Sequence, residues 1–96
     1  MDLATFRASL AGAAPPAGLT AALTALWWDG GGDWDRAHQA AMADEGREAA
    51  WVHAYLHRKE GDRSNAGYWY RRAGRTMPEG TLEAEWEAIA TALLGA

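Results

Sequence analysis

The stretch KEGDRSNAGYWYRRAG, residues 59–74, decides the fold because it repeats a pattern from earlier in the chain, in DGGGDWDRAHQAA at residues 29–41. In both stretches a glycine precedes an aspartate, and an alanine follows the aspartate by four positions. The residues are Gly32, Asp33 and Ala37 in the earlier copy and Gly61, Asp62 and Ala66 in the later one. Glycine favours the end of a helix, and aspartate caps the start of the next. The repeat therefore predicts two helical hairpins.

Helix signals also dominate the rest of the sequence, which has few β-branched residues and no sustained alternation of apolar and polar residues. We expect one all-α domain over residues 1–96, with about six antiparallel helices, because short connections force neighbouring helices to run antiparallel. The expected helices are residues 3–10, 19–28, 34–43, 47–60, 65–74 and 81 onward. Two hairpins would form the middle, the first helix would cover one end and the sixth would cap the other.

The second hairpin resembles a tetratricopeptide repeat over residues 47–78, where Gly-Asp is followed by small and aromatic residues of that motif. The matching residues are Ala54, Ala66, Tyr70, Ala73 and Pro78. The first hairpin, about residues 18–46, has Ala41 where an aromatic residue is usual and lacks the closing proline. The resemblance implies a helical-repeat fold whose concave face binds a protein or peptide. The chain is also similar to a family of small bacterial proteins with no assigned activity.

The resemblance places the first helix of each hairpin on the concave face, where the fourth helix would present aromatic residues beside cations. The YWYRR run at residues 68–72 adds two arginines. Cations beside aromatic rings suit a partner that carries carboxylates. We therefore predict a non-enzymatic binding module that recognises an acidic protein or peptide. The predicted partner-binding residues are Trp51, Tyr55, Arg58, Lys59, Arg71 and Arg72.

Charge is distributed unevenly along the chain. The net charge is −4, yet residues 57–75 sum to +4, so the remaining residues sum to −8. A local basic patch on an acidic chain disfavours nucleic acid as the partner. No apolar run approaches the ~20 residues of a membrane span, so we expect a cytoplasmic protein without a membrane partner. Six tryptophans in 96 residues also favour a homodimer formed through an exposed aromatic face.

The sequence carries no recognisable catalytic motif. WWDGGGDW, residues 27–34, is rich in glycine but lacks the Gly-Lys-Ser/Thr of a phosphate-binding loop. The paired carboxylates are typical of solvated helix faces, and none is assigned as a general acid or base. We therefore expect neither a cofactor nor enzymatic activity.

A rival hypothesis rests on the histidines. His53 and His57 are four residues apart, which on a helix brings both imidazoles within reach of one metal ion, and His38 can supply a third ligand. Asp29 or Glu60 can add a carboxylate. The rival function is a small metal- or ligand-binding protein, with enzymatic activity left open. The simpler interpretation is that His53 and His57 are core residues bonded to backbone carbonyls or tyrosine hydroxyls.

Overall fold

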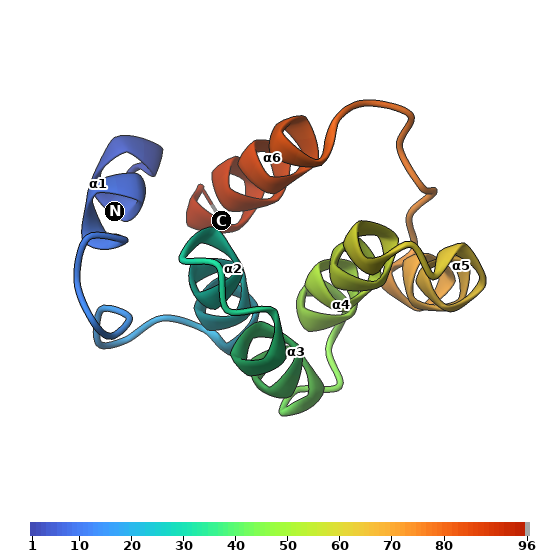
Figure 1. The fold of residues 1–96 in the computed structure, drawn as a ribbon, viewed down its shortest axis with the longest axis horizontal. Coiled ribbons are helices and arrows are strands. Elements are labelled where there is room, and N and C mark those ends of the chain that lie inside the picture. Colours follow the sequence, from blue (N-terminus) through green and yellow to red (C-terminus); the bar gives the residue numbers. More distant parts are fainter. Residues whose placement is uncertain (96) are drawn as a thin grey trace.

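The computed structural model describes residues 1–95, which form six α-helices and no β-strand (Figure 1). The helices are α1 (Leu3–Ser9), α2 (Ala21–Gly30), α3 (Trp34–Met42), α4 (Arg47–Glu60), α5 (Arg63–Ala73) and α6 (Leu82–Leu94). This confirms the prediction of an all-α fold with six helices, and each expected range overlaps one of them. No helix in the described part of the chain combines the length and the apolar character that crossing a membrane requires.

The two Gly-Asp corners form as the sequence predicts. Gly32 and Gly61 have left-handed backbone angles, with φ of 86° and 90°, which residues with a side chain rarely adopt. Asp33 and Asp62 then begin α3 and α5. Each aspartate accepts a hydrogen bond from the amide nitrogen three residues later, at 3.0 Å and 3.2 Å. These bonds satisfy amide groups that have no partner within the helix, and so fix where each helix starts.

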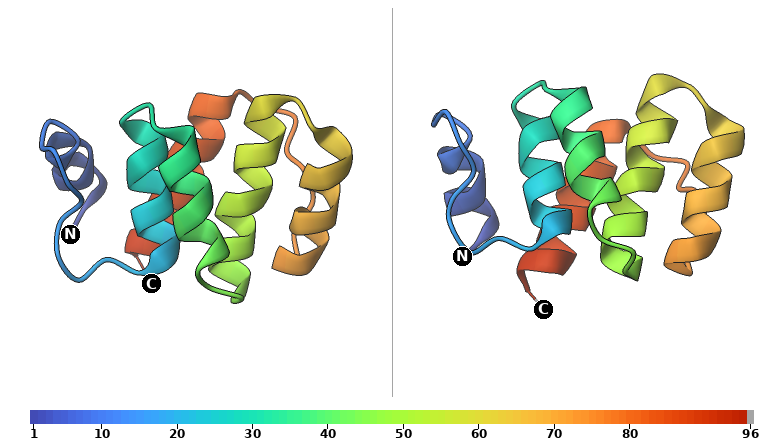
Figure 2. Two further views of the ribbon diagram at one scale, coloured as in Figure 1. Left: turned by 60° about the horizontal axis from the view of Figure 1, so that its bottom comes forward. Right: turned by 90° about the horizontal axis from the view of Figure 1, so that it is seen from below.

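Helices α2, α3, α4 and α5 lie side by side in one row (Figure 2). Four alanines at the helix contacts let the backbones approach closely, and all four are fully buried. They are Ala25, Ala37, Ala54 and Ala66. Helix α4 is the most buried helix of the row, since all nine residues from Ala49 to His57 are buried. The predicted central place of this helix is therefore correct.

From the sequence we expected α6 to cap the far end of the row, beyond α5. In the structure it lies elsewhere. It packs along α2, α4 and α1, and the segment of residues 74–81 carries the chain back to reach them (Figure 1). Trp86 and Ile89 form its buried face, and the Trp86 indole donates a hydrogen bond to the Leu26 carbonyl at 3.1 Å. The apolar stripe of α6 thus covers the first helices of both hairpins and closes the core.

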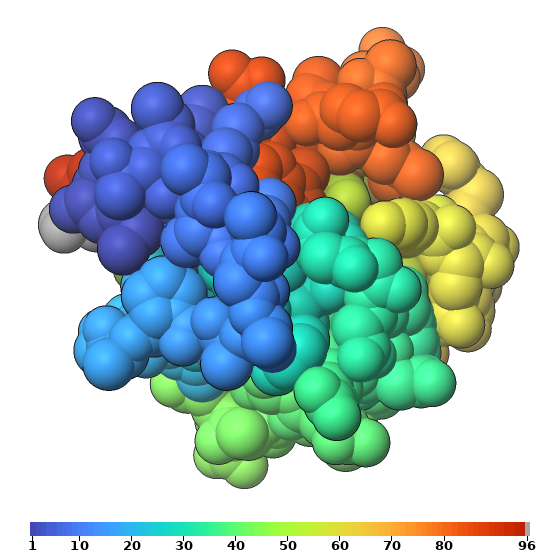
Figure 3. All heavy atoms as spheres, turned by 60° about the vertical axis from the view of Figure 1, so that its left-hand side comes forward, coloured from blue at the N-terminus to red at the C-terminus, as the bar shows by residue number. Residues whose placement is uncertain are grey.

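Helix α1 covers one end of this core. Phe6 is fully buried and its ring lies 5.8 Å from that of Trp86, so α1 packs on α6. Ser9 accepts a hydrogen bond from the Trp27 indole at 3.0 Å, which links α1 to α2. Figure 3 shows the N-terminal segment, in blue, spread over this end of the molecule beside α6. The expected covering role of the first helix is confirmed.

Candidate functional site

All three histidines of the chain meet at one place, on the contact between α3 and α4. His38 comes from α3, and His53 and His57 come from successive turns of α4. A ligand nitrogen from each ring lies within 4.8 Å of one from each of the other two. The ring centres are 4.7 Å (His38–His53), 5.2 Å (His38–His57) and 4.9 Å (His53–His57) apart. We call this group the histidine cluster.

Two tryptophans hold the rings of the histidine cluster in place. The Trp34 ring stacks on His38, with centres 4.9 Å apart and planes inclined by 9°, and its indole donates to the Leu56 carbonyl at 2.9 Å. The Trp69 ring from α5 stacks on His53, with centres 3.8 Å apart and planes inclined by 16°. Stacking on rings that are themselves packed restricts the imidazoles to few rotamers. Helices α3, α4 and α5 therefore all shape the site.

Hydrogen bonding leaves the cluster able to accept a further partner. The His57 Nδ1 atom lies 2.5 Å from a carboxylate oxygen of Glu60. Because an ionised carboxylate only accepts, His57 donates from Nδ1, and the tautomer protonated there has a lone pair on Nε2. The side chains of His38 and His53 form no hydrogen bond with residues 1–95. The expectation of bonds from His53 and His57 to carbonyls or tyrosines is therefore wrong: the one partner is the Glu60 carboxylate.

The exposure of the His53 nitrogens can be inferred from the hydrogen-bonding state of the buried polar atoms. Among the described residues, every fully buried side-chain nitrogen or oxygen has a hydrogen-bond partner. The His53 nitrogens have no such partner, so they must keep a small exposed area although the residue is buried. An ion or a water molecule can therefore reach the cluster from outside.

The electrostatic setting disfavours the charged forms of His38 and His53. Burial, together with the neighbouring His38 and His57, lowers the pKa of His53 to about 4. Burial and the charge of His57 also lower the pKa of His38, against the opposing pull of Glu60 and Asp35. Neutral imidazole is the form that binds metal ions, so protons compete weakly at these two rings near neutral pH.

The surface predicted to bind an acidic partner is largely covered by α6. Trp51 and Tyr55 are buried. The Lys59 ammonium donates to Asp29 at 2.9 Å, and the Tyr55 hydroxyl donates to the other Asp29 oxygen at 2.9 Å. Burial and the Asp29 charge raise the pKa of Tyr55, so this hydroxyl stays protonated. Asp29 is therefore engaged here and does not join the histidine cluster.

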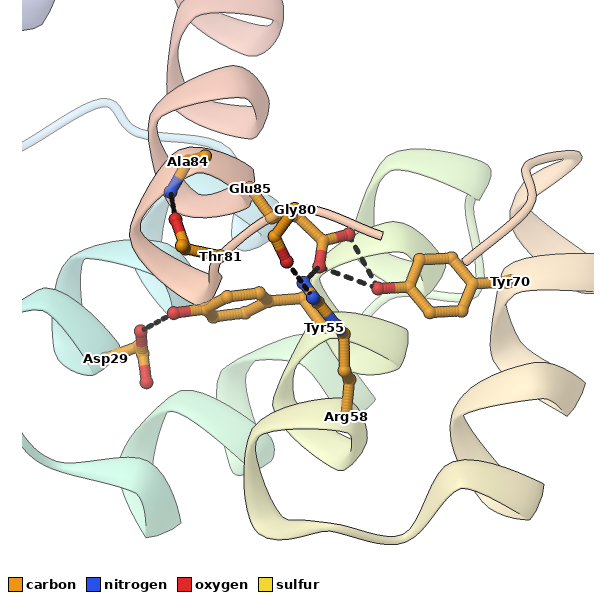
Figure 4. A network of polar contacts seen from close by, with 8 residues as sticks. All are labelled: Asp29, Tyr55, Arg58, Tyr70, Gly80, Thr81, Ala84 and Glu85. Carbon is orange, nitrogen blue, oxygen red and sulfur yellow. Dashed lines mark hydrogen bonds and ion pairs between the residues drawn. The ribbon is translucent and has the colours of Figure 1, made fainter. Parts of the chain in front are cut away.

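Arg58 is also engaged inside the protein (Figure 4). Its guanidinium donates to Glu85 of α6 at 2.8 Å and to the Gly80 carbonyl. The Tyr70 hydroxyl donates to the two oxygens of the same carboxylate at 2.8 Å and 2.6 Å. This buried network joins α4, α5 and α6. Sequence reasoning missed it because Glu85 stands among other glutamates of an apparently solvated face, and nothing in its spacing marks Arg58 or Tyr70 as partners.

The two arginines of the YWYRR run lie on different faces of α5. Arg72 sits over the Trp69 ring, 5.3 Å from its centre, and bonds the Tyr68 hydroxyl at 3.2 Å. Arg71 instead lines a pocket that also includes Trp51. The six residues predicted for partner binding therefore do not form one continuous surface.

Comparison with known proteins gives no further guide to the site. No protein-family model matches the chain, and no curated protein sequence or solved structure shows significant similarity to it. The resemblance to tetratricopeptide repeats stays a prediction from the sequence.

Proposed function

We propose that the protein binds a divalent transition metal ion, Zn²⁺ in the first place, through His38, His53 and His57. The observation that carries the proposal is the convergence of all three histidines of a 96-residue chain on one place. Imidazole is a preferred ligand of Zn²⁺, Cu²⁺ and Ni²⁺. Three protein nitrogens are also a common ligand set of zinc sites that keep a fourth position for water or another ligand.

The distances fit such a site after a small adjustment. Zinc–nitrogen bonds of about 2.0–2.1 Å at tetrahedral angles place the ligand nitrogens about 3.3 Å from one another. The cluster holds its nitrogens within 4.8 Å, so binding an ion would draw them together by up to about 1.5 Å.

Glu60 supports the proposal from outside the ligand set. Histidine ligands commonly donate their second nitrogen to a carboxylate, which fixes the ring and makes the ligand nitrogen more basic. The contact between His57 Nδ1 and Glu60 has this arrangement and leaves Nε2 for the metal. The bound ion would also tie α3, in the first hairpin, to α4, in the second. Metal binding would therefore stabilise the packing of one hairpin on the other.

Calorimetric titration of untagged, chelator-treated protein with Zn²⁺ tests the proposal. We expect one ion per chain. The His38→Gln variant should weaken binding by at least about 100-fold, since it removes a ligand rather than an outer partner. Gln39→Ala, at the neighbouring position on α3, is the matched control and should bind as the wild type does. Zinc binding that is equally tight in the His38→Gln variant would refute the site.

A further inference from the structure

We propose that the protein has a second site, separate from the histidine cluster, where an acidic peptide binds beside Trp51, Arg71 and Arg75. These residues border a pocket of about 710 Å³ between α4, α5, the segment that follows α5 and the start of α6. This volume lies within the ~300–1,000 Å³ that is typical of ligand sites. The pocket retains Trp51 and Arg71 from the six residues predicted for partner binding, but it includes Arg75 and lacks Arg58 and Lys59.

The two arginines of the pocket are free to bind a partner. Neither Arg71 nor Arg75 forms an ion pair or a side-chain hydrogen bond with residues 1–95. The Arg75 guanidinium lies 3.4 Å from the centre of the Trp51 ring. A guanidinium stacked in this way keeps its edge for a bidentate bond with a carboxylate. The pocket therefore presents an oriented anion-binding group beside a second cation.

Two further observations set the charge of the pocket. Glu85 is the one acidic residue among those that line it, and its carboxylate already accepts bonds from Arg58 and Tyr70. Arg47 lies close by, since its Nη1 atom is 3.7 Å from the place where a Cβ on Gly74 would stand. The residues that line the pocket therefore carry more positive than negative charge, on a chain whose net charge is negative.

The walls favour a peptide over a nucleic acid. Pro78, Ala84 and Ala88 also line the pocket and offer an apolar surface for a side chain next to a bound carboxylate. A nucleic acid strand instead needs a basic groove that follows its backbone. Outside residues 57–75 the chain sums to −8, which would repel a long polyanion. A short acidic segment with interspersed apolar residues suits both features.

A rhodamine-labelled peptide of sequence Glu-Leu-Glu-Leu-Glu, followed by fluorescence anisotropy at low salt, is the probe. The double variant Arg71→Gln/Arg75→Gln should bind it about tenfold or more weakly, because each arginine loses a charge-assisted bond. The matched control is Arg63→Gln/Arg72→Gln, which removes the same charge from α5 outside the pocket and should change affinity less than about twofold. The far-UV circular dichroism spectrum and the thermal unfolding midpoint of the Arg71→Gln/Arg75→Gln variant should match those of the wild type, which shows that its fold is intact.

Three outcomes would overturn the inference. The wild-type protein could fail to bind the peptide. Both double variants could bind the peptide more weakly by the same factor, in which case the net charge of the protein alone attracts the peptide. A labelled oligothymidylate of matched charge could bind more tightly than the peptide and respond more strongly to the pocket variant, in which case the site belongs to nucleic acid. None of these results depends on the histidine cluster, so the metal proposal stands or falls separately.

Discussion

His53 is held between the Trp69 ring and two other imidazoles, and this setting makes a pH dependence testable. In the unfolded chain its pKa returns to about 6.5, whereas in the folded chain burial and the two neighbouring histidines lower it to about 4. The unfolded state therefore binds more protons between these values, and stability must fall as pH decreases from about 6.5 to about 4. Allowing for solvent screening, His53 should contribute a loss of about 1–2 kcal/mol.

Urea unfolding of chelator-treated protein at pH 7 and pH 4.5 measures this loss. Carboxylates also titrate in this range, so the wild type is compared with His53→Gln, in which the histidine part is absent. On acidification the free energy of unfolding of His53→Gln should fall by about 1–2 kcal/mol less than that of the wild type. An identical loss in both proteins would show that His53 is not buried in its neutral form.

The corners between helices allow a paired test with glycines. Gly61 has φ of +90°, so Gly61→Ala forces an alanine into a left-handed conformation and should destabilise the protein by about 1–2 kcal/mol. Gly67 lies within α5, and the nearest atom to a Cβ there would be the Arg71 Nη1 at 3.5 Å. Gly67→Ala should therefore stabilise by roughly 0.5–1 kcal/mol. Thermal unfolding of both variants checks the signs, and a stable Gly61→Ala protein would contradict the assigned corner.

The helix boundaries could be predicted from the sequence because local groups set them. Asp33 and Asp62 cap through bonds to amides only three residues away, and Gly61 ends α4 by its own backbone angle. The start of α2 was less clear, since Thr20 caps it and Leu19 stays outside. The place of α6 could not be predicted. Its apolar stripe shows that one face is buried, but not which helices cover it.

The histidine cluster was predictable in part. The four-residue spacing of His53 and His57 predicts that both lie on one face of a helix. His38 lies near them because α3 packs against α4. Trp34 and Trp69 were not foreseen as its walls, because stacking depends on how three helices pack together. The buried carboxylate network was missed for the same reason, since its members come from α4, α5 and α6.

The placement of α6 shapes the molecule as a whole. It fills the face of α2 and α4 on which the tetratricopeptide resemblance would place a bound peptide. The histidine cluster lies on the contact of α3, α4 and α5, and the arginine pocket lies between α5 and the start of α6. Trp27, Trp51 and Trp86 are buried and the other three tryptophans are partly buried, and the homodimer stays a prediction.

The buried Arg58–Glu85 ion pair links α6 to α4, so its loss should lower the free energy of unfolding of the whole protein. The two side chains are 11% and 3% exposed. Arg58→Met leaves Glu85 buried with Tyr70 as its remaining partner, which should destabilise the protein by about 3 kcal/mol. The double variant Arg58→Met/Glu85→Met removes both charges and should be more stable than the single one. Urea unfolding followed by tryptophan fluorescence measures both, and a cost below about 0.5 kcal/mol for Arg58→Met would show that the pair is not buried.

The most direct test of the metal proposal is a Co²⁺ titration of the chelator-treated protein, followed by visible absorption, because tetrahedral Co²⁺ absorbs far more strongly than the hydrated ion. With three imidazoles and one open position, we predict intense bands that reach a plateau at one Co²⁺ per chain and disappear on addition of Zn²⁺. The His38→Gln variant should show no such bands. A wild-type protein whose spectrum stays that of hydrated Co²⁺ would contradict the assignment of His38, His53 and His57 as a metal site.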